Sequence, residues 1–162
     1  MLSLDIDIDS PWPAATDWAD LAEAALEATA QVAPELANQR LTASLLFTSD
    51  AEVHTLNREW RGKDKPTNVL SFPMLERADL LALKADGPPE MLGDIAMAFE
   101  TCAREAAEKG VPLEHHATHL IVHGLLHLSG LDHEISPQDA AEMEALEIKA
   151  LAQLGIENPY CD

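Results

Sequence analysis

Three histidines stand at a spacing that suits metal binding: His123, His127 and His133. Four residues advance a helix by about 6 Å and roughly 40°, so the first two imidazoles project from one face. Ser129 and Gly130 follow, and a glycine just past a helix end takes a left-handed backbone that would bring His133 back toward them. Three neutral imidazoles suit zinc and leave a fourth position for water. The spacing therefore predicts one catalytic zinc ion per chain, although a lone histidine on a helix is usually an ordinary packed or surface residue.

The same offsets occur in zinc proteases with the pattern HExxHxxGxxH, where a glutamate general base follows the first histidine. Here that position is Gly124. Glycine inside a helix costs about 1 kcal/mol relative to alanine, so its place beside a ligand suggests a need for room. We expect a bulky, charged backbone to approach there, which favours a phosphodiester substrate over a peptide.

Further histidines precede the pair on the same predicted helix. His115 and His119 lie at successive four-residue steps before His123, and His116 lies beside them. His119 could orient a ligand or carry a proton in catalysis. It could equally be a helix-face histidine without a role, and that interpretation is at least as good for His115 and His116.

The histidine segment resembles the signature of a known family. HGLLHLSGLDH is similar to the HGxLHLxGYDH motif of the YbeY endoribonucleases, and residues 56–73 (LNREWRGKDKPTNVLSFP) are similar to that family's second block. Residues 93–95 (GDI) and 155–160 (GIENPY) match further segments in the family's order. Leu131 and Trp60 depart from it, because each stands where the family often has tyrosine.

The resemblance implies a function and partners. YbeY proteins are metal-dependent endoribonucleases of ribosomal RNA maturation, including the 3′ end of 16S rRNA, and of ribosome quality control. The resemblance thus implies single-stranded RNA as substrate, ribosomal RNA as its class, and the small ribosomal subunit with its proteins as partners. It also points to Arg61 as a functional arginine.

The basic residues of the second block support an RNA contact. The net charge of −19 argues against general nucleic-acid affinity, because nonspecific binding needs phosphates to be neutralised. Yet four of the ten basic residues fall within eight positions, Arg58, Arg61, Lys63 and Lys65. Arg61 is the strongest candidate, since a guanidinium grips two phosphate oxygens at any pH. The alternative is a solvated loop whose lysines pair with Glu59 and Asp64.

These residues suggest roles in RNA cleavage. We predict Arg61 and His119 as catalytic residues, with Arg61 offsetting charge in the transition state, while Thr67, Asn68 and Ser71 help the basic residues to position the strand. Zinc could polarise a phosphate oxygen or activate water. The nucleophile is water or the 2′-OH, and the general base is a metal-activated water, His119 or Asp132. Asp132 and Glu134 could also orient His133 or simply form a turn.

Two other classes of protein remain open. An amide hydrolase or peptidase would explain the histidine spacing, but Gly124 removes its expected base. A non-catalytic ribosome-binding module with structural zinc would also explain the basic residues. Metal-dependent RNA cleavage separates these classes from a nuclease.

Bulk properties suit an intracellular enzyme. The length of 162 residues suits a single domain, residues 1–162. Cys102 and Cys161 show no disulfide spacing, as expected in a reducing cytosol. The N-terminal residues lack the pattern of a signal peptide, and no apolar run is long enough to span a membrane. We therefore expect a cytoplasmic protein without membrane contact.

Periodicity predicts an α+β domain, with a mixed sheet of about four strands packed by about five helices. The family resemblance implies a zincin-like version of this fold, and by analogy to zincins we expect strand 93–98 to form the edge of the cleft. The alternation of Leu2, Leu4, Ile6 and Ile8 with polar residues predicts the first strand. The other predicted strands are 41–48, 68–72 and 93–98, and the predicted helices are 17–32, 50–60, 99–109, the histidine helix ending before Ser129, and 137–154.

Overall fold

A computed structural model describes residues 1–131 and 136–160. The described elements are β1 (Ser3–Ile8), α1 (Trp18–Val32), a 3-10 helix (Pro34–Ala37), β2 (Leu41–Thr48), α2 (Asp50–Arg61), β3 (Val69–Pro73), α3 (Arg77–Ala82), β4 (Glu90–Ala98), α4 (Phe99–Lys109), α5 (Leu113–Leu128) and α6 (Pro137–Gln153). The predicted α+β class is confirmed. His133 and the flanking Asp132 and Glu134 lie outside the described residues.

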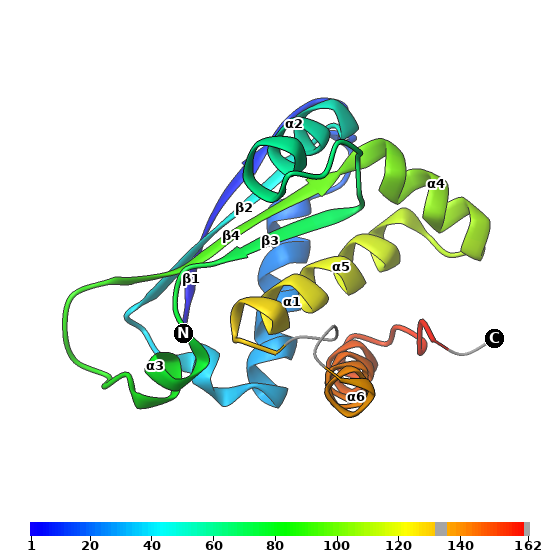
Figure 1. The fold of residues 1–162 in the computed structure, drawn as a ribbon. Coiled ribbons are helices and arrows are strands. Elements are labelled where there is room, and N and C mark those ends of the chain that lie inside the picture. The colour runs from blue at the N-terminus through cyan, green and yellow to red at the C-terminus, as the bar shows by residue number, and fades with distance from the viewer. Residues whose placement is uncertain (132–135, 161–162) are drawn as a thin grey trace.

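The four strands form one mixed sheet in the order β1-β2-β4-β3 (Figure 1). β1 pairs with β2 and β2 with β4 in parallel, whereas β3 pairs with β4 in the antiparallel direction. β4 is therefore an inner strand, and the expectation that residues 93–98 form the edge of the cleft is wrong. The edge beside the histidine helix is β3, because the chain returns antiparallel to β4 there.

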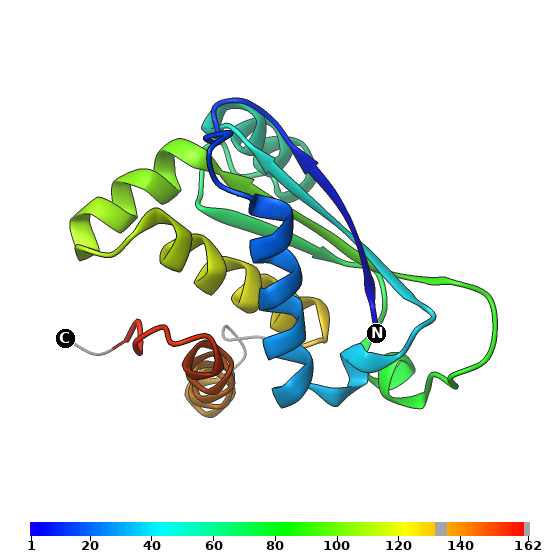
Figure 2. The same cartoon turned by 180° about the vertical axis from the view of Figure 1, so that it is seen from behind.

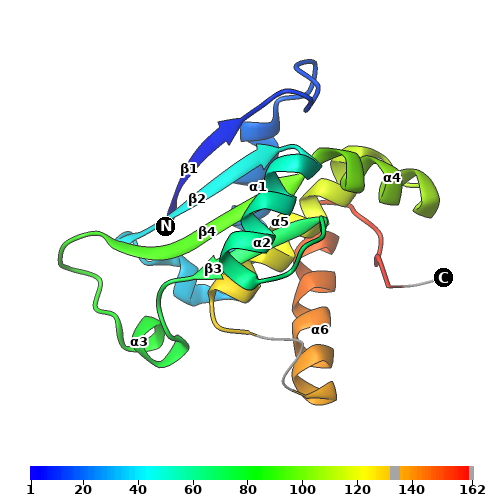
Figure 3. The same cartoon turned by 45° about the horizontal axis from the view of Figure 1, so that its top comes forward.

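Helices cover both faces of the sheet. α1 and α5 pack on one face, with α6 below them (Figures 1 and 2). This layer encloses the main apolar core, in which Phe47 of β2, Ile95 of β4 and Ile121 of α5 are fully buried. α2 lies across the opposite face (Figure 3), where Val53 packs with Leu70 in a smaller cluster. The site helix α5 is thus clamped between sheet and helices.

Local sequence signals set most helix ends. Asp17, Ser49 and Ser136 each accept a hydrogen bond from the backbone N–H three residues later, as N-caps do. Gly62, after α2, has φ +67°, and Gly110, after α4, has φ +68°, the left-handed conformation that favours glycine. Gly130 has φ +92°, as expected for the turn after the histidine helix.

Helix α3 was not predicted, and it supports the end of α5. Its first residue, Arg77, donates a hydrogen bond of 2.8 Å to the carbonyl of Ser129 and contacts Glu35 at 3.2 Å. A cation at a helix C-terminus satisfies the last carbonyls and stabilises the helix dipole. α3 therefore supports the C-terminal end of α5.

Candidate active site

His123 and His127 line one cleft, as the four-residue step predicts. The cleft has a volume of about 450 Å³ and lies between α5, the edge strand β3, the segment that follows α2 and the C-terminal segment. α5 is apolar on its other faces, and Ile121, Val122 and Leu125 are completely buried. Packing of these residues fixes the rotation of the helix and turns the histidine face toward the cleft.

A buried carboxylate on α6 holds His123. Glu147 is 1 % exposed, and its Oε1 lies 2.9 Å from His123 Nδ1 and 3.2 Å from His119 Nε2. Burial alone would raise the pKa of Glu147, but the hydrogen bonds from His119 and His123 outweigh it and lower the pKa to about 2. An ionised carboxylate only accepts hydrogen bonds, so Nδ1 of His123 carries the proton and Nε2 carries the lone pair.

Ser71 holds the second histidine. Its Oγ is in hydrogen-bond contact with Nδ1 of His127, across from the edge strand β3 to α5. Both histidines of the pair therefore use Nδ1 for a protein contact. This arrangement is common for histidines that bind metals through Nε2, because the contact at Nδ1 fixes the tautomer and the ring orientation.

The third predicted ligand, His133, lies outside the described residues. Within residues 1–131 and 136–160, no group of three or more histidine, cysteine, aspartate or glutamate side chains is arranged to hold a metal ion. The zinc site thus stays a prediction, supported by two of its three proposed ligands.

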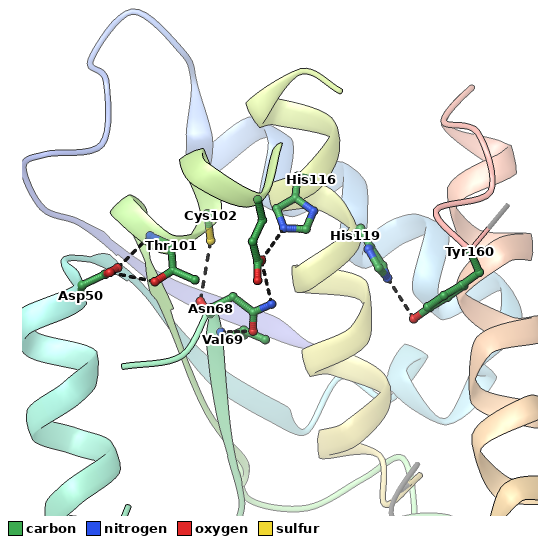
Figure 4. A network of polar contacts seen from close by, with 9 residues as sticks. Asp50, Asn68, Val69, Thr101, Cys102, His116, His119 and Tyr160 are labelled. Atoms are coloured by element: carbon green, nitrogen blue, oxygen red, sulfur yellow. Dashed lines mark hydrogen bonds and ion pairs between the residues drawn. The ribbon is translucent and has the colours of Figure 1, made fainter. Parts of the chain in front are cut away.

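His119 and Tyr160 stand at one end of the cleft. Tyr160 donates a hydrogen bond of 2.9 Å to Glu147 Oε2. Its hydroxyl also lies 3.2 Å from His119 Nε2 (Figure 4), and the two rings are edge-on with centroids 5.4 Å apart. Nε2 of His119 faces Glu147, and its buried Nδ1 has no hydrogen-bond partner in the described part of the chain. Burial, followed by the charge of Glu147, raises the pKa of the Tyr160 phenol, which therefore stays protonated and donates.

Basic side chains also line the cleft. Arg61, Lys63 and Lys65 all face the cleft, whereas Arg58 is exposed and is not part of the described wall. The loop that carries the lysines is tied to α2 by the buried Asn57, whose Nδ2 donates to the Lys65 carbonyl at 2.8 Å. Three of the four basic residues predicted to contact RNA therefore line the cleft, and Arg58 does not.

The alternative interpretation pairs these lysines with the carboxylates of Glu59 and Asp64. Asp64 contacts His54 Nε2 at 2.7 Å, and Glu59 is exposed on α2. The contact of Asp64 with His54 disfavours the interpretation in which the lysines serve only as partners for this carboxylate.

The polar residues predicted to position RNA also line the cleft: Thr67, Asn68 and Ser71. Asn68 is held by internal contacts, since its Nδ2 donates to Glu105 at 3.0 Å and its Oδ1 accepts from the Val69 N–H at 2.7 Å. Glu105 also contacts His116 Nε2 at 2.8 Å. Asn68 and Ser71 therefore help to shape the cleft through protein contacts, and their contact with RNA stays a prediction.

A second network fixes the start of α4 beside Asn68. Asp50 accepts hydrogen bonds from the Thr101 N–H at 2.9 Å and from its hydroxyl at 2.8 Å (Figure 4). The buried thiol of Cys102 donates to the Asn68 carbonyl at 3.7 Å. Burial raises the pKa of Cys102, so this thiol is an inert packing group.

The prediction that Gly124 makes room for a phosphodiester backbone is wrong. A Cβ at this position would lie 3.1 Å from Ile95 Cδ1 of β4, so the glycine faces the sheet and not the cleft. Its absent side chain lets α5 approach β4 closely, and it makes no room for a phosphate. Any larger residue here would press its Cβ against the Ile95 side chain.

Sequence reasoning missed Glu147, Tyr160 and the contact between Glu105 and His116. One signal for Glu147 was present, because a glutamate stands on the otherwise apolar face of α6 formed by Met143, Ala150 and Leu151. A charged residue at a buried helix position usually has a specific partner. The partner could not be named, because it lies on another helix.

Fold and site together define an α+β protein with a histidine-lined, basic-walled cleft. The family model for endoribonuclease YbeY matches residues 8–155. A protein of Erythrobacter litoralis named endoribonuclease YbeY is 63% identical over 161 residues, 99% of each chain, and one of Novosphingobium aromaticivorans is 60% identical over 97% of this chain and 95% of its own. The chain belongs to the YbeY endoribonuclease family, which confirms the resemblance seen in the sequence.

A solved structure agrees with the fold. The solution structure of a Thermotoga maritima protein superposes with a TM-score of 0.60 at 21% identity, covering 100% of this chain and 97% of its own. None of the described helices combines the length and the apolar character that a membrane crossing requires.

Proposed function

We propose that the chain is a zinc-dependent endoribonuclease that cleaves single-stranded RNA in ribosomal RNA processing, including maturation of the 16S rRNA 3′ end, and in ribosome quality control. Family membership supports RNA cleavage as its activity. The small ribosomal subunit and its proteins are the proposed partners, and the cytoplasm is the proposed location. The observation that carries the proposal is that two histidines at metal-ligand spacing and three basic side chains line the same cleft.

His123, His127 and His133 are the proposed zinc ligands. The fit rests on the donor chemistry of the first two: Glu147 and Ser71 occupy the Nδ1 positions, so that Nε2 is the nitrogen suited to the metal. His133 joins them from its spacing in the sequence. Bound zinc would supply Lewis-acid activation of water or of a phosphate oxygen.

The other residues have roles that follow from their positions. Arg61 would bind phosphate oxygens and offset the charge that develops on phosphorus, since its guanidinium stays ionised and donates in pairs. Lys63 and Lys65 would hold neighbouring phosphates. His119 keeps its place in the proposed catalytic set, and its contact with Glu147 favours a role in orienting that carboxylate.

The geometry around Gly124 disfavours a peptidase. In HExxH proteases the residue after the first histidine supplies the general base. Here that position is a glycine packed against Ile95, so the chain has no carboxylate where those proteases place their base. A phosphodiester substrate also suits the three cations of the cleft wall better than a neutral peptide.

The proposal is tested by incubating the purified protein with single-stranded RNA, the matching RNA duplex and casein, each with and without a zinc chelator. We expect cleavage of single-stranded RNA alone, lost with chelator and restored by added zinc. Casein cleavage would identify a peptidase, and RNA binding without cleavage under any condition would identify a binding module.

A further inference from the structure

A second and larger cavity lies beside the cleft. Its volume is about 690 Å³, and it is formed by the end of α4, the first turn of α5 and the C-terminal segment. His119 lines both cavities. His119, which faces Tyr160 of the C-terminal segment in Figure 4, thus stands where the two cavities meet.

The walls of this second cavity combine apolar and polar side chains in similar measure. Val111, Pro112, Ile156 and Pro159 supply the apolar part. His115, Glu157 and Asn158 supply hydrogen-bonding groups, and the exposed Lys109 supplies a positive charge. Sites for small organic groups typically have volumes between about 300 and 1,000 Å³ and offer both apolar contacts and hydrogen-bonding groups.

We propose that this second cavity binds one unpaired nucleobase of the RNA strand, from a nucleotide next to the phosphate that is cleaved. This inference rests on the proposed function. It deepens that function by assigning a base-binding site to residues that none of the predicted roles includes. The apolar walls would contact the faces of the base, and Asn158 and Glu157 would contact its edge.

The charges favour a base over a phosphate in this cavity. The Glu157 carboxylate would repel a phosphate, but it accepts hydrogen bonds from the exocyclic amino groups that cytosine and adenine carry. Lys109 lies at the exposed end of α4, where it would attract the phosphate attached to the bound base. The base would therefore enter and the backbone would stay outside.

Contacts on both sides give the cavity fixed walls. His116 is 3 % exposed and is held by Glu105, which also holds Asn68 in the cleft. On the other side, Asn158 Oδ1 accepts a hydrogen bond of 2.8 Å from the Tyr160 N–H. A site whose walls are fixed before binding loses less entropy when the base enters.

A cavity of this kind would contribute to a preference for single strands. A base in a duplex is stacked and has its pairing edge occupied, whereas a base in a single strand can turn out of the stack and enter a pocket. The base-binding cavity would then add to any preference for single-stranded RNA that the cleft itself provides.

The test uses a short single-stranded RNA with one cleavage site and a set of copies that each lack the base at one position. Cleavage and binding of every copy are measured with wild type, with Val111→Trp, which fills the cavity, and with Leu81→Trp, a matched change on α3. Val111 and Leu81 are both exposed, at 39% and 58%, so both tryptophans are compatible with folding. Asn158→Ala serves as a second cavity variant.

We expect wild type and Leu81→Trp to lose about 10-fold in cleavage or binding when one base near the cleavage site is missing, a typical effect of one stacked base. Val111→Trp should cleave and bind the intact RNA about as weakly as wild type cleaves and binds the RNA that lacks this base. Removal of the base should cause no further loss of cleavage or binding in Val111→Trp. Asn158→Ala should show a smaller loss on removal of the base than wild type.

Other results would overturn the proposal in distinguishable ways. If wild type cleaves RNA but no position matters, or if the same loss persists in Val111→Trp and in Asn158→Ala, the nuclease stands and the base site is wrong. If wild type binds the RNA without cleaving it, the binding data still decide the base site. If it neither binds nor cleaves, both proposals fail.

Discussion

The Glu147 carboxylate accepts a hydrogen bond from Nδ1 of His123 at 2.9 Å, although the two residues lie on different helices. The carboxylate is buried, and it is ionised at neutral pH because its pKa is lowered to about 2. It fixes the tautomer in which Nε2 of His123 is the nitrogen suited to the proposed zinc ion. α6 therefore contributes to the site without lining the cleft.

This contact predicts an effect of α6 on zinc. Glu147→Gln removes the charge while keeping the size of the side chain, so we expect zinc affinity to fall by about 10- to 100-fold, as for other partners of metal-bound histidines. Competition with a chelating dye measures this affinity. The control is Glu144→Gln, an exposed residue one turn earlier on α6. Equal affinities of Glu147→Gln and wild type would remove Glu147 from the site.

The contact between the buried His116 and the partly buried Glu105 predicts sensitivity to acid. Burial lowers the pKa of His116 below 6.5, so the folded state resists its protonation. Burial would raise the pKa of Glu105, but the hydrogen bonds from His116 and Asn68 outweigh it and lower that pKa below 4.5. A histidine with a lowered pKa contributes stability above pH 6.5 that is lost as the pH falls, and a carboxyl with a lowered pKa likewise loses its contribution below pH 4.5.

The measurement is urea unfolding of the metal-free protein at pH 7.5 and pH 5.5, where His116 is the member of the pair that changes. We expect the free energy of unfolding of wild type to be lower at pH 5.5, and the drop to be smaller in His116→Gln. His54→Gln changes a more exposed histidine and serves as the control. An equal drop in wild type and His116→Gln would show that this histidine does not carry the effect.

Arg61 is expected to act on the rate and not on the metal. Arg61→Lys keeps the charge but loses the paired N–H groups. We therefore expect kcat to fall by about 10- to 100-fold, which is no more than the fall typically seen when one hydrogen-bond donor to the transition state is removed. Zinc content should not change. Arg104→Lys, at an exposed position on α4, is the matched control. A kcat equal to that of wild type would exclude Arg61 from the reaction.

Because the chain is acidic and only three basic residues of its described part line the cleft, we expect RNA binding to depend weakly on the salt concentration. With Arg61, Lys63, Lys65 and the proposed metal ion in the cleft, about two to four phosphates would be neutralised, and the slope of log K against log salt should lie near −1.5 to −3 at about 0.7 per contact. Titrations of a labelled single strand at several salt concentrations measure it. Lys63→Glu with Lys65→Glu should flatten the slope, and a slope steeper than about −4 would reveal another RNA surface.

The elements of the fold could be predicted because their signals are local. The strand Leu41–Thr48 and the helix Phe99–Lys109 have the predicted bounds, since alternation and glycine stops are properties of neighbouring residues. The position of β4 inside the sheet was not predicted, because strand order depends on contacts between distant segments. α3 was missed because six residues carry too little periodicity to distinguish a helix from a loop.

The residues of the site likewise fall into those that local sequence predicts and those that depend on contacts between distant segments. The pair of His123 and His127 follows from a four-residue step on one helix, and the basic residues from their clustering. Glu147 and Tyr160 reach the site only through the packing of α6 and the C-terminal segment against α5. The role of Gly124 was misjudged for the same reason, because the neighbour that demands a glycine is Ile95, on another element.

The most direct test of the account measures bound zinc and RNA cleavage together, in wild type, His127→Ala and His115→Ala. Wild type should hold one zinc ion per chain and cleave single-stranded RNA. His127→Ala should lose most of both, whereas His115→Ala should keep its zinc, because this exposed residue lies outside the proposed ligand set. Stoichiometric zinc together with full cleavage in His127→Ala would contradict the proposed centre.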